Sequence, residues 1–344
     1  MTFTAQGEWP GTDFAEAVRI IFGELGRPGD IDPAGVPFVP QLPARGLGAD
    51  QVGHAAALLA DLHIDAQPHG WRLVDRPGLD EGRTARLQSR DIDRLAENAA
   101  DYSGRLKIQV LGPWSLAARL WLSRGDRVIA DTGARRDVLQ SYAEGVDEYA
   151  ARIREILPAA WLTVQLDETV LDNVLDGRIP TVSGFGRIPP VPPREVEAGL
   201  AGVIERLAAD NEHVIVDATG NRLARRDHGE NRSLVGLLAD AGATAVAAPV
   251  QGLDSGGWEA VAEIVERGVR FRPVVDAAGR HAAEVRGGID AIRTQWHELG
   301  MPTSGLADLD LVAASAPDDS ARDARAGLDY VRAVARGLYE AAFD

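Results

Sequence analysis

The sequence predicts a single (β/α)8 barrel that takes in residues 1–344. Short, uninterrupted apolar runs alternate with amphipathic helical patterns, and about eight such units follow one another at a spacing of roughly 40 residues. Uninterrupted apolar runs are typical of parallel strands that are buried on both faces. The alternative is an open, doubly wound sheet. That fold would place a G-x-G-x-x-G motif after an early strand, and the sequence has none there.

The strands are predicted from apolar composition. The clearest runs are Lys107–Leu111, Trp161–Leu166, His213–Asp217, Thr244–Ala248 and Val269–Val275. Weaker runs at Thr4–Gly7, Val36–Val39 and Gly300–Ser304 bring the set to the number that a barrel needs.

The helices are predicted from apolar periodicity together with start and stop signals. Pro193 marks a helix start, while Gly242, Gly268 and Gly300 mark helix ends. Two segments rich in proline and glycine, 26–43 and 178–193, are expected to be loops over the mouth of the barrel. The predicted helices are Asp13–Leu25, Ala49–Leu62, Asp131–Leu157, Pro193–Asp210, Asn231–Ala241, Gly257–Arg267, His281–Leu299 and Asp318–Ala342.

Composition excludes several classes of function. The chain has no cysteine, so disulfides, thiolate–zinc sites, iron–sulfur clusters and a cysteine nucleophile are excluded within it. A net charge of −16 argues against nucleic-acid and membrane partners. Lys107 is the only lysine, so it alone could form a Schiff base. Neither a membrane-spanning run nor a signal peptide is recognised, so we expect a cytoplasmic protein.

Acidic residues follow three predicted strands. Asp167 and Glu168 end the run Val164–Leu166, Asp217 ends the next strand, and Asp276 follows a later one. Catalytic residues of a barrel lie at the carboxyl ends of its strands, so these carboxylates predict an acidic mouth suited to acid–base chemistry or to an ammonium group. The alternative is that Asp167 or Glu168 caps the following helix.

Other candidate residues also have structural interpretations. Trp114 and Ser115 follow the strand Lys107–Leu111; Trp114 either stacks on a flat ligand or packs in the core, and Ser115 can cap the next helix. His228 lies in a charged segment that reads as a solvated loop in preference to a metal site.

The same segments resemble a known family in order along the chain. They are similar to motifs of the catalytic domain of cobalamin-independent methionine synthase, including its single-domain bacterial relatives. The resemblance implies a barrel of the methionine synthase and uroporphyrinogen decarboxylase type. The matching segments are 7–12 (GEWPGT), Gly70–Trp71, Leu111–Ser115 (LGPWS), Gln165–Thr169 (QLDET) and Pro302–Leu306 (PTSGL).

The family's activity is methyl transfer from methyltetrahydropteroylglutamate to homocysteine, whose thiolate is held by zinc on one His, one Glu and two Cys. Here those positions are expected at Val216–Ala218, Ala247–Pro249 and Ser304, none of which supplies the family's ligand. No His stands at Asp276–Ala278, near which the proton-donating His of the larger enzymes would fall. We therefore expect no zinc cofactor. Asp217 and Asp276 offer oxygen ligands, which would favour Mg²⁺ over Zn²⁺.

The resemblance also implies roles for individual residues. Asp167 would hold the ammonium group of the substrate and act with Glu168 in the chemistry. Glu8 stands where the family has Ser, and Gln41 stands where it has Glu. The other expected substrate-binding residues are Gln165, Trp114, Ser115, Asp217 and Ser304.

Two functions remain open from the sequence. One is a diverged methionine-synthase-like transferase for a small amino-acid-like or pterin-like ligand. The other is a non-catalytic relative that binds a small molecule or a partner protein through the same mouth.

Overall fold

Eight parallel strands form one sheet in the part of the chain that the computed structural model describes, residues 1–26, 33–225, 232–278, 284–314 and 318–344. The strand order is β2-β1-β10-β9-β8-β7-β6-β5, so neighbouring strands follow one another along the chain except where the first strand, β1, pairs with the last, β10. The strands are β1 (Thr2–Ala5), β2 (Ala34–Gly35), β5 (Gly104–Leu111), β6 (Ala160–Asp167), β7 (His213–Asp217), β8 (Ala245–Pro249), β9 (Arg270–Val275) and β10 (Asp310–Ala313).

The sheet closes on itself between β2 and β5. Phe38, just beyond β2, forms a parallel bridge with Lys107 of β5. The amide of Lys107 donates to the carbonyl of Pro37 at 2.9 Å, and the amide of Val39 donates to the carbonyl of Lys107 at 2.9 Å. This bridge brings the two outer strands of the curled sheet together, which confirms the predicted TIM-barrel-like fold.

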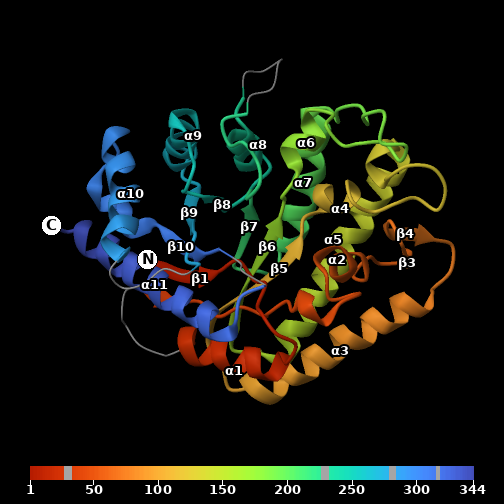
Figure 1. Ribbon diagram of the computed structural model, residues 1–344, viewed down its shortest axis with the longest axis horizontal. Coiled ribbons are helices and arrows are strands. Elements are labelled where there is room, and N and C mark those ends of the chain that lie inside the picture. Colours follow the sequence, from red (N-terminus) through yellow and green to blue (C-terminus); the bar gives the residue numbers. More distant parts are fainter. Residues whose placement is uncertain (27–32, 226–231, 279–283, 315–317) are drawn as a thin grey trace.

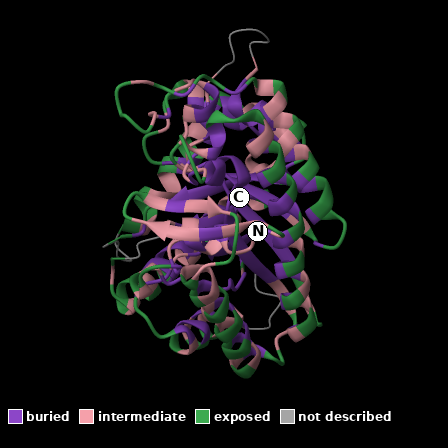
Figure 2. Ribbon diagram, turned by 90° about the vertical axis from the view of Figure 1, so that its right-hand side faces the viewer, coloured by how far each residue is buried: buried purple, intermediate pink, exposed green. Residues whose placement is uncertain are grey.

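The helices surround the strands (Figure 1). Longer helices turn an apolar stripe inward; on α7, for example, Val196, Leu200, Val203 and Leu207 are buried at helical spacing. The burial colouring shows the same division, with buried strands inside and exposed helix faces outside (Figure 2). The helices are α1 (Phe14–Leu25), α2 (Gln51–Ala56), α3 (Leu79–Ala99), α4 (Pro113–Ala117), α5 (Thr132–Ile156), α6 (Leu171–Leu175), α7 (Pro193–Ala208), α8 (Leu234–Asp240), α9 (Ser255–Glu266), α10 (Val285–Glu298) and α11 (Ala321–Ala341).

An excursion between β2 and β5 was not predicted from the sequence. It contains the antiparallel hairpin of β3 (His63–Gln67) and β4 (Gly70–Val74), followed by the long helix α3. In each strand of the hairpin a single residue is buried, Ile64 or Trp71, so the apolar signal is weak.

The structure corrects two sequence predictions. No strand forms at Gly300–Ser304: Pro302 precedes a 3-10 helix, η4 (Thr303–Asp308), and the last barrel strand is β10 (Asp310–Ala313). Segment 26–43 is also not simply a loop over the mouth, because its residues 34–41 continue the barrel wall through β2 and the bridges at Phe38 and Gln41.

Removing the Phe38 side chain should destabilise the barrel at its closing seam. Phe38 is fully buried, and its ring lies 6.1 Å from that of Trp9 and 5.5 Å from the Lys107 ammonium. We expect Phe38→Ala to lower the free energy of unfolding by about 3–5 kcal/mol. Phe185→Ala is the matched control: Phe185 is 100% exposed, so the expected change is within about 0.5 kcal/mol. Equal effects of the two substitutions in urea denaturation would contradict this role for Phe38.

Candidate functional site

Two carboxylates stand side by side at the carboxyl end of the barrel. Asp167 is the last residue of β6 and Asp217 the last of β7, and the two are partners in the parallel register. Both are buried, with 7% and 2% of their surface exposed. Their placement at the mouth confirms the strand ends predicted for these two residues.

Asp167 keeps one oxygen open. Its Oδ1 accepts a hydrogen bond from Gln165 Nε2 at 2.8 Å, and the same amide donates to the carbonyl of Gln6 at 3.0 Å. Within the described residues, no hydrogen bond reaches Oδ2. Burial raises the pKa of Asp167 well above its usual value, and the negative charge of Asp217 raises it further. The site therefore favours a proton or another cation at this oxygen.

Asp217, by contrast, is held by donors. Gln6 Nε2 donates to its Oδ2 at 2.8 Å, and the amide of Thr219 donates to its Oδ1 at 2.8 Å. Gln6 also donates to the hydroxyl of Thr219 at 3.0 Å, so three residues form one small network. Asp217 is thus a fixed charge that acts on Asp167.

Lys107 lies beneath this pair inside the barrel, fully buried. Its Nζ donates to the carbonyl of Gln6 at 2.6 Å and to Gln109 Oε1 at 3.2 Å. Burial lowers the pKa of Lys107 to about 7, against the opposing charges of Asp167 and Asp217. Lys107 was not predicted to belong to the site; the signal for it was a charged residue between the apolar Leu106 and Ile108 of a buried strand.

Gly7 permits the close packing around Gln109. The φ of Gly7 is +142°, and a Cβ there would lie 2.2 Å from Gln109 Cδ. With that space open, Gln109 Nε2 reaches the carbonyl of Val39 at 2.6 Å, which links β5 to the strand extension beyond β2.

Glu168 points away from the mouth into the first turn of α4 (Pro113–Ala117). Its Oε1 accepts from the amide of Trp114 at 2.9 Å, and its Oε2 accepts from the amide and hydroxyl of Ser115 at 2.9 and 2.7 Å. Gly112 makes room, because a Cβ there would lie 2.5 Å from Glu168 Cδ. Both oxygens of Glu168 are therefore occupied, and the residue positions α4.

The remaining predicted residues are spread around the mouth. Trp114 is 1% exposed and its indole donates to the carbonyl of Val196 on α7 at 3.1 Å, which is the core-packing interpretation of this residue. Gln41 is buried and donates to the carbonyl of Gln109 at 2.9 Å. Glu8 is half-buried beyond β1, and burial together with the charge of Asp318 raises its pKa.

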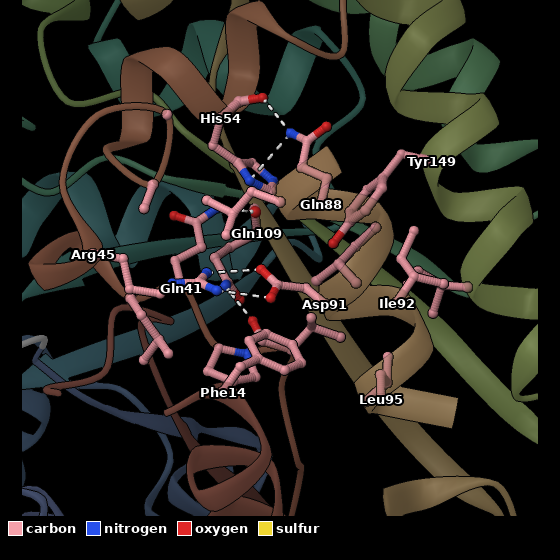
Figure 3. A pocket seen from close by; sticks show the side chains of 18 residues that line it. Phe14, Gln41, Arg45, His54, Gln88, Asp91, Ile92, Leu95, Gln109 and Tyr149 are labelled. Atoms are coloured by element: carbon pink, nitrogen blue, oxygen red, sulfur yellow. Dashed lines mark hydrogen bonds and ion pairs between the residues drawn. The ribbon is translucent and has the colours of Figure 1, made fainter. Parts of the chain in front are cut away.

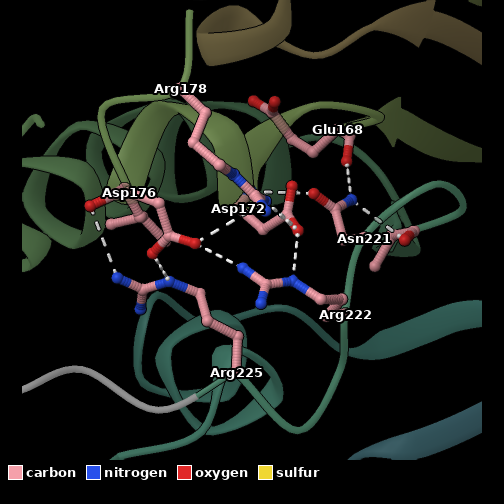
Figure 4. Close-up of polar contacts among 9 residues, drawn as sticks. Glu168, Asp172, Asp176, Arg178, Asn221, Arg222 and Arg225 are labelled. Carbon is pink, nitrogen blue, oxygen red and sulfur yellow. Dashed lines mark hydrogen bonds and ion pairs between the residues drawn. The ribbon is translucent and has the colours of Figure 1, made fainter.

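An ion-pair network fixes the loops that follow β6 and β7 (Figure 4). Asp172 Oδ2 accepts from Arg178 at 2.7 Å and from Arg222 at 3.1 Å. Asn221 donates to the carbonyl of Glu168 at 2.5 Å. The network therefore braces the backbone next to Asp167. Its charged members are Asp172, Asp176, Arg178, Arg222 and Arg225.

A separate cavity beside η1 (Pro43–Arg45), α2 and α3 is too small for an organic ligand (Figure 3). Its volume of about 20 Å³ suits one water molecule. Three buried polar atoms without a hydrogen-bond partner face it: Gln41 Oε1, Arg45 Nε and His54 Nε2. Burial lowers the pKa of His54 to about 4, so it is neutral at pH 7.

Ser304 does not belong to the mouth. It lies in η4, ahead of the amino-terminal end of β10, and so at the opposite end of the barrel from Asp167. The residues at the carboxyl end of β10 are Ala313 and Ala314, and 315–317 lie outside the described residues. The position of Ser304 follows from chain direction, because a segment that directly precedes a parallel strand lies at the amino-terminal end of that strand, here called its foot.

The described side chains do not fit a zinc ion. The chain has no cysteine, and no group of three His, Cys, Asp or Glu side chains is arranged to hold a metal in the described ranges. The oxygen site considered for Asp217 and Asp276 is not among them: Asp276 is exposed and its carboxylate accepts from the amide of Ala278 at 3.1 Å. His228 and His281 lie outside the described residues.

Comparison with known proteins reaches the fold and no further. No family model matches the chain, and no curated protein matches it. A solved B12-independent methionine synthase from Shewanella sp. W3-18-1, in complex with selenomethionine, is similar at 13% identity and a TM-score of 0.46, covering 73% of this chain and 66% of that one. This chain thus spans just under two thirds of that protein.

Other barrels are similar to the same degree. A D-psicose 3-epimerase determined in the presence of D-fructose has 11% identity and a TM-score of 0.43, covering 98% of this chain and 99% of that one. A variant of P. fluorescens subsp. cellulosa xylanase A in complex with xylopentaose has 12% identity and a TM-score of 0.45, covering 100% and 97%. Structural similarity at this level shows the fold alone.

No helix in the described residues is long and apolar enough to cross a membrane.

Glu168 should make stability depend on pH. Burial raises its pKa to about 7 from an ordinary 4.5, so the folded state binds a proton that the unfolded state has lost between these values. Stability from this group is therefore present below pH 4.5 and is lost as the pH rises to 7. Relative to wild type, Glu168→Gln should gain on the order of 3 kcal/mol across that window, because each pKa unit is about 1.4 kcal/mol.

Urea denaturation at steps from pH 4.5 to 7.5 measures this difference. Glu97→Gln is the control, since Glu97 is exposed on α3 and forms an exposed ion pair with Arg94. A difference between Glu168→Gln and wild type that stays flat with pH would contradict the buried titration.

Proposed function

We propose that this protein binds a small amino-acid-like molecule at the mouth of its barrel, with Asp167 accepting the ligand's ammonium group. The observation that carries the proposal is the open Oδ2 of a buried Asp167 beside the fixed charge of Asp217. A cation at Oδ2 would replace the proton that burial otherwise retains there. Gln165 would orient the carboxylate through its hydrogen bond to Oδ1.

We further propose that the chain is a diverged relative of cobalamin-independent methionine synthase. The support is the ordered set of motifs, of which QLDET provides Gln165 and Asp167 at the mouth. In this proposal Glu168 acts as a positioning residue through α4. The donor chemistry of the chain does not fit thiolate–zinc activation, so no zinc-dependent methyl transfer to homocysteine is proposed.

The second candidate is a binding protein without catalysis. Val216 and Ala248 favour this candidate. Both are buried apolar residues, and they lie where the family's zinc ligands are expected. A turnover assay with homocysteine and methyltetrahydropteroylglutamate distinguishes the two candidates, because a pure binding protein would form no methionine.

Neutralising Asp167 should remove the ammonium site. We expect Asp167→Asn to weaken binding of L-methionine by roughly tenfold or more in isothermal titration calorimetry, since a hydrogen bond to a charged group contributes about 1.5–3 kcal/mol. Wild-type affinity should rise with pH as Asp167 ionises. Asp290→Asn on α10 is the control, because it removes the same charge from an exposed side chain. Unchanged affinity in the Asp167 variant would overturn the proposal.

Zinc should bind neither wild type nor a Ser304→Cys variant in stoichiometric amount. A single thiol at position 304 lies at the foot of β10, far from Asp217, and gains no partner ligands. The measurement is metal content after dialysis against zinc. One tightly bound zinc per wild-type chain would contradict the proposed loss of metal chemistry.

A further inference from the structure

A second cavity opens at the opposite end of the barrel from Asp167. It has a volume of about 290 Å³ and is lined by residues from the amino-terminal parts of the strands. That volume is many times what one water molecule requires and approaches the size of small-ligand pockets. The cavity is strongly basic: its charged lining residues are Arg105, Lys107, Arg270, Arg272 and Asp310.

Arg272 is the unusual member of this set. It lies on β9, is 4% exposed and lines the cavity. Its Nε is buried without a hydrogen-bond partner, and no ion pair or hydrogen bond reaches its guanidinium from the described residues. A guanidinium cannot shed its charge at ordinary pH, and burying one without a partner is costly. The charges of Asp310 and Asp217 act on Arg272 from a distance, but neither carboxylate forms an ion pair or hydrogen bond with it, so an anion in the cavity would supply the missing direct partner.

The one carboxylate in the lining is already engaged. Asp310 Oδ1 accepts from the amide and hydroxyl of Thr2 at 3.0 and 2.7 Å, and its Oδ2 lies 3.3 Å from Arg270. Arg105 pairs with Glu212 at 3.2 Å. These contacts leave the cavity with an excess of positive charge around Arg272.

We propose that this cavity binds a small phosphate-class anion, inorganic phosphate or a phosphate monoester, with Arg272 as its main anchor. A planar guanidinium donates two parallel hydrogen bonds to such an oxyanion, a geometry that an ammonium cannot reproduce. Arg105 and Arg270 flank the anion and add charge without requiring new burial. The net charge of −16 repels anions at long range, but at physiological ionic strength that field is screened within about 8 Å.

This site goes beyond the proposed function, since it lies at the other end of the barrel from Asp167 and uses charge of the opposite sign. The two proposals can therefore fail separately.

The test is thermal unfolding and calorimetry of the full chain in a chloride buffer free of oxyanions. Sodium phosphate should raise the Tm of wild type above the value in sodium chloride at matched ionic strength, because a ligand of the native state stabilises it. Arg272→Met should abolish this rise and lower phosphate affinity at least tenfold. In chloride alone the same variant should be as stable as wild type or more stable, because the unpaired charge is gone.

Controls keep the outcome decisive. Arg293→Met removes an exposed arginine from α10 and should keep the full response to phosphate. Arg105→Met removes a partly exposed arginine from the cavity lining, so this variant is expected to fold. It should weaken the rise of Tm in phosphate, and it tests the proposal even if the Arg272 variant does not fold. Equal Tm values of wild type in phosphate and chloride, a full response in Arg105→Met, or a response to succinate without one to phosphate would each overturn the assignment.

Discussion

The buried lysine at the closing seam is the interaction on which the barrel depends. The backbone of Lys107 forms the two backbone–backbone hydrogen bonds that join the extension of β2 to β5, and its ammonium donates to the carbonyl of Gln6, just beyond β1. Gln6 in turn donates to Asp217 at the mouth. The same residues therefore close the barrel wall and position Asp217 of the acidic pair. A wholly apolar side chain at position 107 would leave the carbonyl of Gln6 without this donor.

The two ends of the barrel carry opposite charge. The mouth presents Asp167, Asp217 and the half-buried Glu8, whereas the foot presents Arg272 and its basic neighbours. Lys107 lies between them and is acted on by both, since Asp167 and Asp217 raise its pKa while Arg272 lowers it. Such a separation of charge along one axis gives each end a preference for ligands of one sign.

Much of the fold was predictable because parallel strands buried on both faces produce uninterrupted apolar runs, as in β6 and β7. The hairpin of β3 and β4 was not, since its strands each bury one residue. The site was half predictable. Strand ends indicated Asp167 and Glu168 together, but neighbouring residues point to opposite faces, and the sequence does not say which of them points inward. Ser304 was misplaced because a short motif does not reveal whether it precedes or follows a strand.

The arginine-rich composition gives the molecule an uncommon property. Lys107 is the only lysine in the sequence and is fully buried. Acylating reagents that react with amines would therefore find no exposed lysine side chain in the folded barrel. The rate of modification at Lys107 would therefore report how often the folded barrel opens enough to expose this side chain.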